Sequence, residues 1–185
     1  MHPKAMFLYG TNKEDGSPNF ALFTWLTYCW DGEYSIMCCI GEPKLTKDRI
    51  LAEGKFSANL VSEAMMPLAD YFGNKSGYNA DKMDIPASIC RGKVLDVPVL
   101  TDSPLIYELE VTQRISLKDD SDIFICKIQN TIKSEVSNNS LEECMRLSKP
   151  AVSIDMEYFT VQPESNGNWG QWKNLKEDKN EQKHN

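Results

Sequence analysis

The residues able to carry acid–base, nucleophilic or metal chemistry are few in this sequence and are not grouped. Its two histidines, His2 and His184, stand near the ends of the chain, and its six cysteines form no CxxC pair and no cluster with histidine. A zinc site is therefore not expected, and neither is a Ser-His-Asp or Cys-His catalytic arrangement. The sequence has no Walker loop and no GxGxxG turn. If the protein performs chemistry, we expect a cofactor to supply it.

The composition is typical of a small globular protein. The chain has 185 residues, of which 41% are hydrophobic and 25% charged, so one domain is expected. Its longest apolar runs, Ala5–Tyr9 and Ile36–Ile40, are far shorter than the ~20 residues of a membrane-spanning helix. The net charge of −7 argues against general nucleic-acid binding. Without a visible secretory signal, we expect a cytoplasmic protein whose cysteines are reduced core residues.

Alternation and turn residues predict mainly β structure with short helices. Residues 5–12 and 20–30 read as a hairpin, and 34–40 follow as the third strand of a meander. Short helices are expected at 46–53, ending at Gly54, and at 64–72, with Pro67 in the first turn. Further strands are expected at 56–61, 105–115, 123–132 and 156–161, with a helix opening at the capping box of Ser140 and Glu143.

Two stretches fall outside this pattern. Residues 74–104 form a long irregular excursion, which in a compact domain is usually functional or bound by a partner. From residue 163 the chain is polar apart from Trp169, Trp172 and Leu175. We therefore expect a domain over residues 1–162 and a polar tail over 163–185. Many short strands with few helices suggest a closed antiparallel barrel.

Three segments carry a resemblance to a known family. They are NFALFTWLT (19–27), PKLTKDRI (43–50) followed by GKFSANL (54–60), and SGYNADKM (76–83). In this order and at these spacings they resemble the flavin reductase-like family of FMN-binding split barrels, which includes flavoredoxin. The likeness extends from about Ala5 to Phe159.

The resemblance implies a fold, a cofactor and a function. The fold would be an antiparallel, Greek-key split β-barrel, and the protein a homodimer with FMN near its interface. The function would be that of an FMN-binding oxidoreductase, which passes electrons from NAD(P)H or a redox protein to an acceptor. An electron carrier that holds FMN without substrate turnover is the alternative, and a structural barrel without cofactor is a third.

The turn at 43–46 is the expected phosphate site. It leads into a helix N-terminus, whose free N–H groups and positive dipole end favour an anion, and Lys44 and Thr46 add a charge and a hydroxyl. The alternative makes Thr46 a helix cap and Lys44 a solvated charge. Glu42 departs from the family pattern and should not face a phosphate.

The resemblance also implies residues around the flavin ring, each with an ordinary structural alternative. Asn19 would meet the polar edge of the ring, or be only a turn residue before a strand. Trp25 would pack against the flavin, or be a core tryptophan. Thr24 and Thr27 would hydrogen-bond to the phosphate or the flavin edge, or be only strand formers, and Lys82 would approach the cofactor, or be a surface lysine. The last candidate is Phe159, with Tyr158 as the alternative. Some relatives place a histidine before the strand at 123–132; this sequence has none there.

Overall fold

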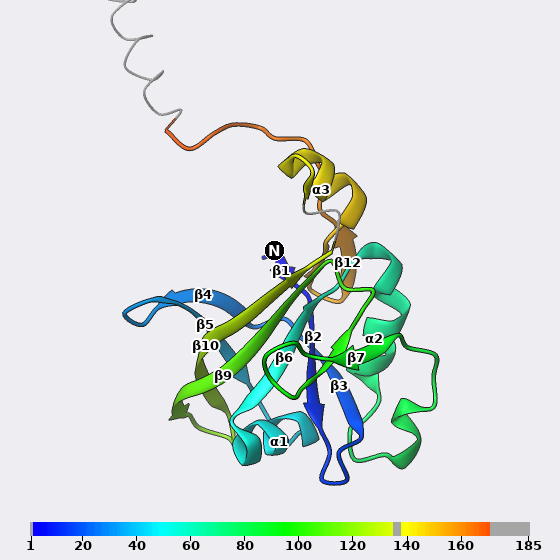
Figure 1. Cartoon of the computed structure of the whole chain (residues 1–185), viewed down its shortest axis with the longest axis vertical. Helices are drawn as coiled ribbons and strands as arrows, with labels where there is room; N and C mark the ends of the chain where they lie inside the picture. The colour runs from blue at the N-terminus through cyan, green and yellow to red at the C-terminus, as the bar shows by residue number, and fades with distance from the viewer. Residues whose placement is uncertain (1, 135–137, 171–185) are drawn as a thin grey trace, which may run out of the picture.

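The fold was analysed in a computed structural model, which describes residues 2–134 and 138–170. Its main element is an antiparallel sheet of seven strands in the order β3-β2-β6-β9-β10-β5-β4 (Figure 1). The strands are β2 (Phe7–Asn12), β3 (Pro18–Phe23), β4 (Leu26–Trp30), β5 (Tyr34–Ile40), β6 (Lys55–Leu60), β9 (Leu105–Ser116) and β10 (Asp122–Lys133). The mainly β architecture predicted from the sequence is confirmed.

Two hairpins were predicted correctly, but the meander was not. β2 pairs with β3, and β9 with β10. The run at 20–30, however, is two strands separated by Thr24 and Trp25, and β4 pairs with β5 at the other end of the sheet. Among the described residues β3 and β4 are the sheet edges and do not pair, so the expected closed barrel is wrong. The chain crosses from one edge to the other at Thr24 and Trp25, which places this link beside an opening.

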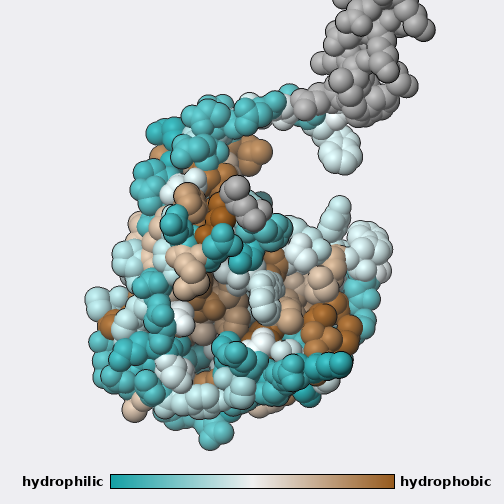
Figure 2. Space-filling view, turned by 180° about the vertical axis from the view of Figure 1, so that it is seen from behind, coloured by the Kyte–Doolittle hydropathy of each residue, from teal (hydrophilic) through white to brown (hydrophobic). Residues whose placement is uncertain are grey.

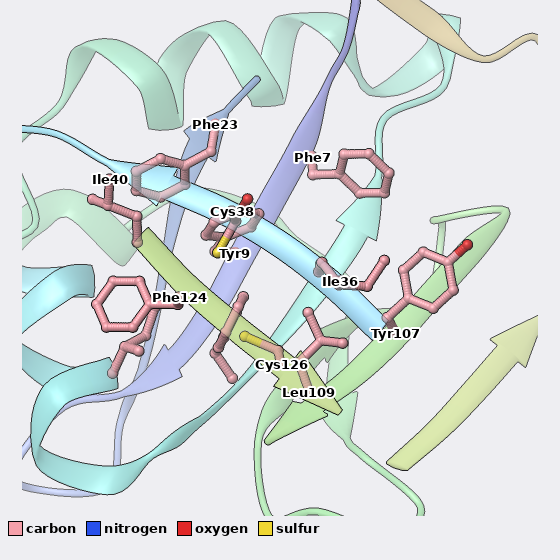
Figure 3. Close-up of a cluster of buried hydrophobic side chains, with 13 residues drawn as sticks. Phe7, Tyr9, Phe23, Ile36, Cys38, Ile40, Tyr107, Leu109, Phe124 and Cys126 are labelled. Atoms are coloured by element: carbon pink, nitrogen blue, oxygen red, sulfur yellow. The ribbon is translucent and has the colours of Figure 1, made fainter. Parts of the chain in front are cut away.

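Figure 3 shows the main cluster of buried hydrophobic side chains of this sheet. Aromatic and aliphatic side chains from β2, β3, β5, β9 and β10 meet there, and the rings of Tyr9 and Phe23 stack with centroids 4.4 Å apart. Cys38 and Cys126 are buried in the same cluster. Cys39 lies on the opposite face of β5, as the alternation of strand side chains requires. Cys29, Cys38, Cys39, Cys90 and Cys126 are free thiols, but the exposed Cys90 is not the core residue that was predicted.

Two helices border the β2–β3 end of the sheet (Figure 1). Helix α1 (Leu45–Glu53) ends at Gly54, whose φ of 68° is left-handed, as predicted. A 3-10 turn, η1 (Glu63–Met65), leads into α2 (Met66–Asn74), which has Pro67 in its first turn. Helix α2 packs on β3. Together these elements place the start of α1 opposite the end of α2.

The excursion at 74–104 is anchored by its own chain. It contains η2 (Ala80–Met83) and the two-stranded pair β7 (Ile89–Arg91) and β8 (Pro98–Leu100). The Asn59 carboxamide oxygen accepts from the Leu100 N–H at 2.8 Å, and the Ser57 hydroxyl donates to the Pro98 carbonyl at 2.5 Å. A second subunit is therefore not needed to order this segment.

A second, small sheet was predicted only in part: the strand at 156–161 was expected, whereas its two partner strands were not. It has the order β1-β11-β12, with β1 (Lys4–Ala5), β11 (Ala151–Ile154) and β12 (Glu157–Thr160). Helix α3 (Leu141–Ser148) precedes it, and the Ser140 hydroxyl accepts from the Glu143 N–H at 3.3 Å, as the capping box predicted. Of the tail, Trp169 is exposed, whereas Trp172 and Leu175 lie outside the described residues.

Candidate functional site

Three pockets that share lining residues adjoin one another past the start of α1 and the Thr24–Trp25 link, and together we call them the groove. Their volumes are about 220, 430 and 290 Å³. The first two share Leu22 and Lys44, and the last two share Thr24, Trp25 and Cys39. We call the first pocket the anion end, the second the middle and the third the aromatic end. Hydrophobic surface gathers on the rear face, on the side that carries β4, β5 and β10 (Figure 2).

The anion end is centred on a buried lysine. Lys82 in η2 is 1% exposed and lines this pocket together with Lys44 and Lys75. Within the described part of the chain, its ammonium has no hydrogen bond and no ion pair; it lies 5.7 Å from the centre of the Phe72 ring. Burial lowers the pKa of Lys82 to about 8, and the charges of Lys13 and Lys44 act in the same direction. An anion bound here would supply the missing partner, so Lys82 is not a surface lysine.

Helix α1 presents its N-terminus to the same pocket. Its N-cap is Lys44, which makes no capping hydrogen bond through its side chain, and Thr46 is the second residue of the helix. Thr46 is therefore not the cap that the alternative interpretation required. Its buried hydroxyl accepts from the Asn19 carboxamide at 3.0 Å, which leaves the hydroxyl hydrogen free to point at a ligand. The first N–H groups of a helix lack intrahelical partners and add further donors.

Asn19 lies at the anion end and not beside Trp25. It is a fully buried residue of β3, not a turn residue, and its amide also donates to the Thr11 hydroxyl at 3.2 Å. Its carboxamide oxygen is buried without a partner among the described residues. Asn19 and Trp25 are six positions apart in largely extended chain, a distance of ~20 Å. The predicted contact with the ring edge would therefore be replaced by one near the phosphate.

Gly77 lets the backbone approach this cluster closely. A Cβ at this position would lie 2.8 Å from the Leu45 Cβ and 2.9 Å from the Asn19 carboxamide oxygen. Next to it, the Tyr78 hydroxyl donates to Asp48 at 2.6 Å, which raises the pKa of Tyr78 to about 12. The 76–78 segment is thus fixed against α1 and forms one wall of the pocket.

The middle of the groove is bordered by the β9–β10 turn. Asp119 and Ser121 line it, together with Glu42 and Lys44, which form an ion pair at 3.5 Å. The turn is held by Lys47, a buried residue of α1 whose ammonium lies 2.9 Å from a carboxylate oxygen of Asp120. The geometry of the wall is therefore connected to the start of α1.

The aromatic end is open to solvent. Trp25 is 58% exposed, so it is not a core tryptophan, and its carbonyl accepts from the Cys39 N–H at 3.0 Å. Thr24 and Thr27 line the same pocket, as do Met37 and Ile123. Burial raises the pKa of the Cys39 thiol, which therefore favours the neutral form. The result is an apolar slot against one exposed indole.

Two residues of this end were missed by the sequence analysis. His2 and Lys4 line the pocket beside Trp25, so a histidine does reach the groove, although it comes from the N-terminal segment. They are brought there by β1, in which Lys4 pairs with Ser153. A two-residue strand leaves no periodicity to detect. In contrast, Phe159 and Tyr158 line a different pocket beside α3 and do not border the groove.

The groove fits a long molecule with a phosphate at one end and a flat ring at the other. The anion end has a buried ammonium without an anion and a free hydroxyl hydrogen. The aromatic end offers an apolar slot. These features match the phosphate, the ribityl chain and the isoalloxazine ring of FMN. Among the described residues, no group of acidic, histidine or cysteine side chains could hold a metal ion, and no helix is long and apolar enough to cross a membrane.

Comparison with known proteins gives a consistent result. The structure resembles flavoredoxin from Methanosarcina acetivorans with a TM-score of 0.80 and 19% sequence identity; the match covers 94% of this chain and 92% of the other. It resembles flavoredoxin of Desulfovibrio vulgaris with a TM-score of 0.80 and 24% identity, covering 92% of this chain and 93% of the other. It also resembles the FMN-binding protein from Thermus thermophilus, with a TM-score of 0.75 and 21% identity over 90% of this chain and 91% of the other. These likenesses confirm the split-barrel fold. No curated protein sequence matches. The model of the flavin reductase-like domain matches residues 1–160, and the chain belongs to that family.

Proposed function

We propose that this protein binds FMN in the groove and acts as an FMN-dependent oxidoreductase with NAD(P)H as electron donor. The observation that carries the proposal is Lys82, a buried cation without an anion in a pocket that faces a helix N-terminus. Family membership and the FMN-binding protein among the similar structures support the same cofactor. When bound, FMN would supply the capacity to accept a hydride or electrons and pass them on.

The side chains of the chain have separate tasks in this proposal. Lys82, Thr46 and the N–H groups at the start of α1 bind the phosphate. Asn19 accepts from a hydroxyl of the ribityl chain through its unpartnered oxygen. Trp25 packs against the ring, and Thr24 and Thr27 hydrogen-bond to its edge. Lys44 reaches the phosphate by exchanging its ion pair with Glu42 for the ligand.

The second candidate is an electron carrier that holds FMN without substrate turnover. The exposure of the aromatic end favours it, because a redox protein could approach the ring there. The β4–β5 hairpin, which projects from the body (Figure 1), carries further exposed aromatic side chains: Tyr28, Trp30 and Tyr34.

The same hairpin supports a homodimer with FMN near the interface. Exposed aromatic residues grouped on one element are typical of protein interfaces. We expect light scattering to give about twice the chain mass; a monomer that still binds FMN would contradict the interface. The free thiols of the buried Cys38 and Cys126 agree with a cytoplasmic location.

Purification without added flavin tests the cofactor. We expect yellow protein, or flavin-free protein that turns yellow with FMN; a colourless protein that does not bind FMN would leave a structural barrel. Anaerobic titration with NADH and NADPH then separates the two candidates. Bleaching by either nucleotide and turnover with an acceptor indicate the oxidoreductase. Bleaching by a reduced redox protein alone indicates the carrier.

A further inference from the structure

The surroundings of the Lys82 ammonium suit a site at which an anion and a proton bind together. We propose that a phosphate monoester and a proton bind to this site together, the proton on Lys82, so that FMN is held at neutral pH and released as the pH rises. The proposal rests on the proposed function and concerns the regulation of the same site. It would make FMN retention depend on pH, a property that separates a fixed prosthetic group from an exchanging one.

The first argument is the isolation of the amine. Lys82 is 1% exposed, and its ammonium lies 5.7 Å from the centre of the Phe72 ring. A ring face offers a weak substitute for water or a carboxylate. A buried ammonium without an anion is costly, and loss of the proton is the usual way to reduce that cost.

The second argument is the charge around it. From the turn after β2 comes Lys13, and from the start of α1 comes Lys44; both disfavour the charged form of Lys82. From the end of α2 comes Lys75, which also lines the pocket and pairs with Asp81 at 3.8 Å. The remaining acid near the pocket, Asp48, accepts from Tyr78. The cations outnumber the free anions, so the pocket favours either an anion or a neutral Lys82.

The direction of the pH effect follows from the pKa. Without ligand, the pKa of Lys82 is lowered to about 8, mainly by burial. A phosphate dianion beside the amine would raise it again. Below pH 8 the amine is already charged, so binding takes up little extra proton. Above pH 8 each binding event takes up a growing fraction of a proton that approaches one, and affinity falls by up to tenfold per pH unit.

The test compares FMN with riboflavin between pH 7 and pH 9 by flavin fluorescence. Riboflavin lacks the phosphate, and the phosphate of FMN is already a dianion in this range because its second pKa is about 6. We expect FMN to bind roughly tenfold more weakly at pH 9 than at pH 7, and riboflavin to bind equally at both. Equal pH dependence of the two ligands would overturn the proposal.

Variants of the pocket lysines test whether Lys82 is the group that takes up the proton. Lys82→Arg keeps a charge that does not titrate, so FMN affinity should become independent of pH. Lys82→Met should bind FMN weakly and also without pH dependence. Lys75→Met is the matched control, because Lys75 lines the same pocket but is exposed and ion-paired; it should keep the slope of the unmodified protein. Loss of the slope in Lys75→Met would assign the proton to another group.

Calorimetry on the unmodified protein does not depend on how the variants fold. At pH 8.5, FMN binding in buffers of different ionisation enthalpy should show the uptake of more than half a proton, and riboflavin none. No uptake with FMN would overturn the coupling. Failure of the proposed function looks different: FMN would then fail to bind at pH 7.

Discussion

The two ends of the groove differ in how far their side chains are buried and fixed by the described part of the chain. At the anion end Asn19, Thr46 and Lys82 are almost fully buried and fixed by hydrogen bonds or close packing. At the aromatic end Trp25 is 58% exposed and the slot is open. A preorganised pocket provides affinity, whereas an open slot provides access to the ring. The cofactor would therefore be anchored by its phosphate, which leaves the ring free to meet a donor, an acceptor or a second subunit.

The largest effect is expected from filling the close approach at the anion end. In Gly77→Ala, the new Cβ would lie within 3 Å of Leu45 and Asn19 and push the 76–78 segment off α1. FMN affinity should fall by more than about a hundredfold, because several hydrogen bonds to the phosphate are lost together. Riboflavin affinity should fall far less. Both are measured by fluorescence titration.

Gly73→Ala is the matched control. Gly73 lines the same pocket, but its added Cβ would meet only the Leu22 side chain, at 3.2 Å or more, which can move. Its FMN affinity should stay within about threefold of the unmodified protein. A similar loss in both variants would mean that the pocket tolerates no change, and that Gly77 has no special part in it.

Removing one hydroxyl at the anion end should have the next largest effect. In Thr46→Val, FMN affinity should fall by roughly tenfold to a hundredfold, since a hydrogen bond to a charged group contributes ~1.5–3 kcal/mol. Riboflavin affinity should change little. Because Lys44 is the helix cap, no capping bond is lost with the hydroxyl. Parallel losses for both flavins would return Thr46 to a structural role.

Removing the charge of Asp122, beneath the middle of the groove, should lower the free energy of unfolding and leave flavin affinity unchanged. Asp122 is buried, accepts from Arg114 at 2.7 Å and from Ser116 at 3.0 Å, and lies 3.9 Å from the Lys47 ammonium. In Asp122→Asn, the free energy of unfolding at pH 7 should fall by about 2 kcal/mol. Denaturant unfolding measures the difference, and riboflavin affinity provides the comparison.

The difference in unfolding free energy between the unmodified protein and Asp122→Asn should depend on pH. The hydrogen bond from Arg114 is the main cause that lowers the pKa of Asp122. The hydrogen bond from Ser116 and the charge of Lys47 act in the same direction, whereas burial opposes them. A lowered pKa means that the stabilisation is present above the ordinary value of about 4 and is lost as the pH falls below it. The gap between the two proteins should therefore shrink in acid. A gap that widens in acid would contradict this assignment.

A smaller effect is expected at the aromatic end. Trp25→Ala should weaken FMN and riboflavin equally, by roughly threefold to tenfold, because an aromatic pair contributes ~0.5–1.5 kcal/mol. Trp30→Ala removes a similarly exposed indole from the hairpin that does not line the groove, and it should bind both flavins normally. A loss confined to FMN would place Trp25 near the phosphate and reverse the orientation.

No effect on binding is expected from removing the tail. Residues 164–170 are mostly exposed, and Trp169 fully so. A chain that ends at Pro163 should bind FMN with unchanged affinity and melt within a few degrees of the full chain. A weaker complex would show that the tail contributes to the groove or to the interface.

Much of the anion end could be predicted from the sequence, because its residues lie in short motifs. The two helices that border this end have local signals that decide their conformation: Gly54 at the close of α1 and Pro67 in the first turn of α2. The burial of Lys82 could not be predicted, since an Asp-Lys pair in a loop reads equally well as solvated. It follows from packing against Phe72 and the start of α1, which are distant in sequence.

The aromatic end was harder to predict, because it is assembled by long-range pairing. The run at 20–30 has no turn residue to mark the change of sheet edge at Thr24 and Trp25. His2 reaches the pocket only because β1 pairs with β11, near the other end of the chain. Local pattern says nothing about such partners, which is why the meander was predicted and this histidine was overlooked.

The ratio of FMN to riboflavin affinity at pH 7 tests the central claim most directly. It compares two ligands that differ only in the phosphate, on flavin-free protein of unmodified sequence. If the phosphate is anchored by Lys82, Thr46 and the start of α1, FMN should bind at least about tenfold more tightly than riboflavin. Equal affinities would show that the phosphate is not held by this pocket and would contradict the account.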